Sequence, residues 1–132
     1  MFRVEDEVEA REVAVHFAVT CRKDRRPADD IVVSSDLVEG LGLAVAHVPR
    51  TDLDPFLGAR HPEIIGLTPE LTLRLAASIL AGANRHLGRV PMADLELLGV
   101  ELCHRDPELQ RYLRGDWARR LAPLLDDSTS EG

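Results

Sequence analysis

TPELTLRLAASILAGANRHL, residues 68–87, is the stretch that decides the fold. Thr68 can cap a helix because its hydroxyl accepts a hydrogen bond from a free amide of the first turn. Pro69 suits the first helical position, where its missing N–H is not needed, and Gly88 is placed to end the helix. The apolar side chains of this stretch cover about half of the helical wheel, which is wider than the usual amphipathic stripe. They are built around one i,i+4 row: Leu71, Leu75, Ile79, Ala83 and Leu87.

Because this apolar arc is so wide, we predict that the 68–87 helix is buried at the centre of a small helical bundle. The main alternative is a seam between two copies of the chain, since small residues such as Ala76, Ala77 and Gly82 let a neighbouring backbone approach closely. His86 falls inside the arc near the expected end of the helix. The helix dipole there favours a protonated imidazole, whereas burial opposes it.

The composition indicates one soluble domain of 132 residues. Apolar residues make up 45% of the chain but aromatic residues only 4%, so the core must be built mainly from aliphatic side chains. The formal net charge of −7 opposes binding to nucleic acid and to anionic membranes. Only one of the sixteen basic residues is lysine, which is typical of GC-rich bacterial genomes such as those of actinobacteria.

Two cysteines in a chain of this length, Cys21 and Cys103, do not form a disulfide framework. The N-terminus lacks the apolar segment of a signal peptide, and no apolar run reaches the roughly 18 residues of a membrane span. We therefore expect a cytoplasmic protein with free thiols. Its predicted organisation is a loose charged lead-in over 1–11, a single helical domain over 12–125 and a disordered polar tail over 126–132.

The pattern of residues 12–21, EVAVHFAVTC, fits two structures. β-Branched and aromatic residues alternate with smaller ones, which favours a strand that pairs with Ile31-Val32-Val33 in an N-terminal hairpin. The alanines and the acidic residues before them would also suit a helix. We favour the strand and keep the helix as the alternative.

Three further helices are predicted around the central one. Ser34 and Ser35 offer caps for a helix over 36–48, although two glycines weaken it. A second runs over 91–104, and a third begins after Asp106 and continues to about residue 122. Residues 50–66 connect the first of these to the central helix. Together these elements predict a mainly α fold, a small helical bundle around the buried 68–87 helix, with the N-terminal hairpin as its β component.

Two sets of residues are candidates for binding. A small apolar ligand could lie between the helices 36–48, 68–87 and 91–104, with His61, His86 and Trp117 as its polar contacts. Glu101 and His104 are spaced i,i+3, so they share a helix face and could bind one metal ion. Di-iron carboxylate bundles use this pair twice, whereas the chain has it once.

One segment resembles a known DNA-binding motif. ADLELLGV, residues 93–100, is similar to the first helix and turn of helix-turn-helix repressors, and YLRG, residues 112–115, to the end of their recognition helix. The two pieces lie further apart here than in those repressors. The resemblance implies a DNA-binding regulator, with the nearby arginines offset by acidic residues.

The residues as a whole contain no phosphate-binding loop, zinc-ligand spacing or serine-centred catalytic motif. We therefore expect a non-catalytic small helical binding or accessory protein that needs no cofactor. It would form a homodimer and bind a protein partner or a small apolar ligand, with bacterial specialised metabolism as a setting suggested by association alone. The alternatives are the DNA-binding regulator and a small enzyme that depends on a metal ion or a histidine.

Overall fold

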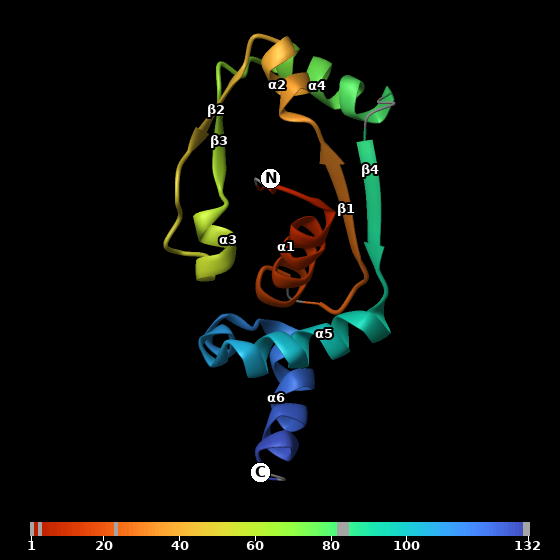
Figure 1. Cartoon of the computed structure of the whole chain (residues 1–132), viewed down its shortest axis with the longest axis vertical. Helices are drawn as coiled ribbons and strands as arrows, with labels where there is room; N and C mark the ends of the chain where they lie inside the picture. The colour runs from red at the N-terminus through yellow and green to blue at the C-terminus, as the bar shows by residue number, and fades with distance from the viewer. Residues whose placement is uncertain (1, 3, 23, 82–84, 131–132) are drawn as a thin grey trace.

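The computed structural model describes residues 2, 4–22, 24–81 and 85–130. In this part the chain is mostly helical and carries two antiparallel sheets of two strands each, so it is a mixed fold rather than a pure helical bundle (Figure 1). The elements in chain order are α1 Glu7–Thr20, β1 Ala28–Val33, α2 Ser35–Gly40, β2 Ala44–His47, α3 Pro55–Ala59, β3 Pro62–Ile65, α4 Pro69–Ala81, β4 Arg85–Val90, α5 Met92–Arg105, the 3₁₀ helix η1 Pro107–Tyr112 and α6 Gly115–Ser130. No helix among these residues is long and apolar enough to cross a membrane.

The four strands are nested in sequence. β1 pairs with β4, from Ala28 opposite Val90 to Val33 opposite Arg85, and β2 pairs with β3 inside the segment between them. Residues 34–81 therefore lie in the chain between the paired strands β1 and β4; we call this segment the excursion. In Figure 1 the excursion runs over α2, down β2 to α3, and back up β3 to α4.

α1 replaces the strand that we favoured for residues 12–21. Asp6 caps it by accepting a hydrogen bond of 2.8 Å from the amide of Glu9. Its buried face follows the alanines, since Ala10, Ala14 and Ala18 form an i,i+4 row that the alternating valines obscure in the sequence. The predicted N-terminal hairpin is also wrong, because residues 31–33 pair with β4 instead.

The central helix is shorter and more exposed than predicted. Thr68 does cap it, through a hydrogen bond of 3.1 Å from the amide of Leu71. α4 spans only Pro69–Ala81, and Leu75 is its one buried residue among those described, so the prediction of a buried helix over 68–87 is wrong. Residues 85–87 lie in β4 instead. Their backbone groups pair with β1 and so do not form the hydrogen bonds of a longer helix.

The remaining helices differ from the prediction mainly at their ends. α2 stops at Gly40, because Gly42 adopts a positive φ of 79° and the chain then forms β2, so the helix predicted over 36–48 is wrong in its second half. α5 agrees closely with the helix predicted over 91–104. The helix predicted from residue 107 to about 122 is split into η1 and α6, since Leu113 is extended and Gly115 has a positive φ of 51°.

The main core lies where α1, α5, η1 and α6 meet the β1–β4 ribbon. Trp117 is its largest fully buried side chain and packs among aliphatic residues, which include Val19, Leu95 and Leu121. Gly99 allows α5 to approach α6, because a Cβ at this position would lie 3.0 Å from Cδ1 of Leu121. A smaller second core, built around Val38, Leu43 and Leu75, joins α2, β2 and α4 in the excursion.

Candidate functional site

A buried polar cluster joins α1 to the start of α3. Nδ1 of His16 lies 3.1 Å from Oδ1 of Asp54, and the hydroxyl of Thr20 lies 3.2 Å from Oδ2 of the same carboxylate. Asp54 also caps α3 by accepting hydrogen bonds from the amides of Phe56 and Leu57, at 3.0 and 3.2 Å. The Thr20 hydroxyl is closer still to the carbonyl oxygen of His16, at 2.6 Å. A single carboxylate therefore organises two elements that lie 34 or more residues apart in the chain.

Aromatic and charged groups close over this cluster. The His16 ring stacks on Phe56, with centroids 4.2 Å apart and planes at 12°. The Arg60 guanidinium lies 3.7 Å from the centroid of the Phe56 ring, and its Nε donates a hydrogen bond of 2.8 Å to Glu9. The contact between α1 and α3 thus extends from the buried carboxylate to an ion pair between Arg60 and Glu9.

The electrostatics of the cluster stabilise the ionised form of Asp54. Burial raises the pKa of this carboxyl, but the hydrogen bond and charge of His16, together with donation by Leu57 and Thr20, lower it by more. The net effect is a pKa below the ordinary value for aspartate. A buried acid that is kept ionised acts as a hydrogen-bond acceptor and not as a proton donor.

An Asp–His pair is a familiar acid–base element, but this pair is closed to solvent. The exposed fractions of His16 and Asp54 are 4% and 1%, and neither residue lines the surface depressions described below. A general base must come within hydrogen-bonding reach of the proton that it removes. The geometry therefore assigns the cluster a structural role, which is to anchor α3 against α1.

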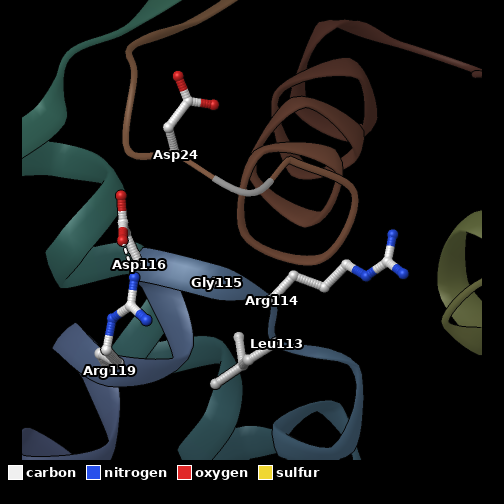
Figure 2. A pocket seen from close by; sticks show the side chains of 6 residues that line it. All are labelled: Asp24, Leu113, Arg114, Gly115, Asp116 and Arg119. Carbon is white, nitrogen blue, oxygen red and sulfur yellow. Dashed lines mark hydrogen bonds and ion pairs between the residues drawn. The ribbon is translucent and has the colours of Figure 1, made fainter.

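An open surface depression of about 560 Å³ lies beside the N-terminus of α6. Figure 2 shows the side chains that line it. Asp116 is hydrogen-bonded to Arg119, and the side chain of Arg114 points away from both Asp116 and Asp24 (Figure 2). The carboxylates and guanidinium groups thus do not converge on a common point. A smaller depression of about 340 Å³ lies between α1 and the β1–β4 ribbon and carries charges of both signs.

The structure separates the residues predicted to contact a ligand. His61 is partly exposed beside β3, with Nδ1 3.3 Å from the carbonyl oxygen of Val48. His86 lies in β4 opposite Val32, not in a helix, and its side chain is outside the described residues. Trp117 is wholly buried in the main core, with the Arg25 guanidinium 5.3 Å from the centroid of its ring. His61 and Trp117 therefore do not share a binding site.

The structure also shows where the helices of the predicted pocket and the predicted metal pair lie. α2 and α4 lie at one end of the molecule, whereas α5 lies beyond α1, next to α6, so the three helices expected to enclose an apolar ligand do not meet (Figure 1). Glu101 and His104 are both exposed on α5. Among the residues that the structure describes, no group of three or more His, Cys, Asp or Glu side chains is arranged to hold a metal ion.

The exposed side of α4 is apolar. Leu73 and Leu80 are 73% and 70% exposed, and Ala76 and Ala77, which lie between them on the same side of the helix, are exposed too. We call these four residues the α4 surface. The opposite side of the helix, with Leu71, Leu75 and Ile79, packs on the second core. α4 thus presents apolar side chains on two sides, although only one of them is covered.

Sequence reasoning noted the apolar arc of α4 but missed the cluster at His16. The arc was visible on the helical wheel, but the wheel does not tell which part of it the chain covers. The cluster could have been found only by treating residues 12–21 as a helix and Asp54-Pro55 as a helix start, because His16 and Thr20 then share one face.

Comparison with protein-family models, curated proteins and solved structures found no match for the chain.

Proposed function

We propose that the protein is a non-catalytic binding protein that holds a polypeptide partner on the α4 surface. The observation that carries this proposal is the exposure of two leucines about two helical turns apart, with two exposed alanines between them, on a helix already packed on its other side. Single exposed leucines are common on protein surfaces, whereas contiguous apolar patches mark interaction sites. Leu97 on α5 illustrates the difference, since it is 72% exposed but its neighbours on the same side of the helix include the charged residues Asp94 and Glu101.

A polypeptide fits this surface better than a small apolar ligand. Small ligands bind in concave sites that bury most of their surface, whereas the α4 surface is the convex side of a helix. A helix that offers anchors at i, i+3, i+4 and i+7 is a common way of binding a partner helix or groove. Leu73, Ala76, Ala77 and Leu80 have this spacing.

The alternatives that we drew from the sequence receive less support from the geometry. The Asp–His pair that an enzyme could use is closed to solvent, as described above. In the segment that resembles a helix-turn-helix, η1 lies between α5 and α6. Arg120 of α6 is paired with Glu96, at 2.7 and 2.9 Å, so its guanidinium is not presented to phosphates.

The proposal is tested by site-specific photocrosslinking in cells that produce the protein. A photoreactive amino acid placed at position 73 should give discrete crosslinked species, whereas the same residue at position 97 should not. Leu97 is the matched control, because its exposed fraction of 72% is almost the same as the 73% of Leu73. Equal crosslinking at both positions, or none at position 73, would remove the α4 surface as a binding site.

A further inference from the structure

The order of residues along the α4 surface is the same in both directions. Read from either end, the exposed side of the helix runs leucine, alanine, alanine, leucine, at positions 73, 76, 77 and 80. Its midpoint falls between Ala76 and Ala77, and each leucine lies about 5 Å from that midpoint along the helix axis at a rise of 1.5 Å per residue. A twofold rotation about an axis through that midpoint therefore brings each leucine opposite a leucine and each alanine opposite an alanine.

We infer that the partner is a second copy of this chain, with the two α4 helices packed antiparallel about a twofold axis at Ala76 and Ala77. This dimer rests on the proposed function, because both use the α4 surface. The rotation places Leu73 of each protomer opposite the partner's Leu80, so this leucine pair forms twice. The alanines meet at the crossing point, where small side chains let the helix axes approach toward the low end of the usual range of about 8–10 Å.

Local charge favours this pairing over a parallel one. In an antiparallel pair the positive end of each helix dipole lies beside the negative end of the other, which is favourable. A parallel pair places like partial charges together at both ends. The charged flank of the surface is already neutralised within each protomer, because Arg74 Nη2 lies 3.7 Å from the Glu70 carboxylate. An apolar face with a neutral flank suits a like partner, since no unpaired charge is buried when two copies meet.

The small size of the surface points to a weak dimer. One side of a 13-residue helix is smaller than the roughly 800 Å² per partner of a standard stable interface. We therefore expect a reversible dimer with a Kd in the range of about 10 to 100 micromolar. The formal charge of −7 per chain makes two copies repel each other, so association should tighten when salt is raised and the repulsion is screened.

Sedimentation velocity of the purified protein from about 1 to about 300 micromolar tests the dimer. The unaltered chain should pass from monomer to dimer over this range. Replacing both leucines with aspartate, Leu73→Asp and Leu80→Asp, should weaken the dimer by about 100-fold or more, because the burial of four leucine side chains is lost and like charges are introduced. Leu97→Asp is the matched control and should leave the dimer unchanged, with the circular dichroism spectrum of each variant reporting its fold.

Disulfide trapping tests the antiparallel register in a Cys21→Ser background. Ala77→Cys should crosslink to itself, because the two sites lie next to the twofold axis. Leu73→Cys should not crosslink to itself. In the antiparallel pair its two cysteines are offset by seven residues, or about 10 Å along the helix axis, which exceeds the roughly 7 Å limit of a disulfide. A mixture of Leu73→Cys and Leu80→Cys protomers should give the crosslinked heterodimer.

The outcomes separate this dimer from the proposed function. A monomer at 300 micromolar, self-crosslinking of Leu73→Cys, or a dimer that survives both aspartate substitutions would overturn the antiparallel α4 dimer. If the protein is monomeric and position 73 still crosslinks to a different polypeptide in cells, the proposed function stands and the dimer falls. If position 73 crosslinks to nothing, both fall together.

Discussion

Replacing Asp54 with alanine should destabilise the protein by about 3 kcal/mol. The loss of the α3 cap costs about 1 kcal/mol, because the amides of Phe56 and Leu57 lose their acceptor. His16 then remains buried without its partner at 3.1 Å, which costs about 2 kcal/mol. Thr20 adds little, since its hydroxyl keeps the carbonyl oxygen of His16 at 2.6 Å. A loss of this size is a large part of the roughly 5–15 kcal/mol by which small domains are stable.

Urea unfolding followed by tryptophan fluorescence measures this loss. Trp117 is the only tryptophan and is fully buried in the main core, so its emission reports the unfolding of that core. Asp52→Ala is the matched control, because Asp52 is an exposed aspartate two residues away that pairs with Arg50 at the surface. We expect no measurable shift of the urea midpoint in this control.

A double-mutant cycle with His16→Ala isolates the pairing itself. The free energy of unfolding should show a coupling of about 2 kcal/mol between positions 16 and 54, in the upper range for residues in direct contact. Additive effects would mean that the Asp54 carboxylate acts only as a cap. An Asp54→Ala variant as stable as the Asp52→Ala variant would refute the anchoring role of the whole cluster.

Three further predictions concern the buried carboxylate, the main core and the backbone of α3. The lowered pKa of Asp54 means that its stabilisation is complete above the ordinary aspartate value of 3.8 and is lost as the pH falls below it, so Asp54→Asn should flatten the acid limb of a plot of urea midpoint against pH. Burial raises the pKa of Cys103 to about 11, so iodoacetamide at pH 8 should label Cys103 only after unfolding, as mass spectrometry of native and urea-treated protein would show, with labelling of native Cys103 contradicting its burial. A Cβ at Gly58 would collide with the carbonyl oxygen of Arg50, so Gly58→Ala should cost about 2 kcal/mol or more in the same urea assay, and an unchanged midpoint would show that the α3 backbone can shift freely.

A helix could be predicted from the sequence where several local signals agree. α5 agrees with its prediction because apolar spacing, the preceding proline and the length all point to a helix. The cap of α4 at Thr68 was predictable for the same reason, since the hydroxyl acts on its own helix. These features depend on residues within one turn of each other.

Features set by distant residues could not be predicted in this way. Residues 12–21 fit two periods, and the choice between them depends on whether a partner strand is available. Residues 31–33 pair with β4, more than 50 residues further on, so α1 has no strand to join and instead covers one face of the ribbon. The His16–Asp54 contact spans 38 residues and could not appear until both helices were placed.

The error at α4 has a different cause, and it bears on function. A helical wheel shows how much apolar surface a helix carries but not how much cover the chain supplies. The excursion holds only short elements besides α4, and α2 with β2 and β3 covers the one side that contains Leu75. The side that carries Leu73 and Leu80 therefore remains exposed. The proposed polypeptide partner would cover this exposed arc, and the like order of its residues from either end is the reason for proposing a copy of the same chain.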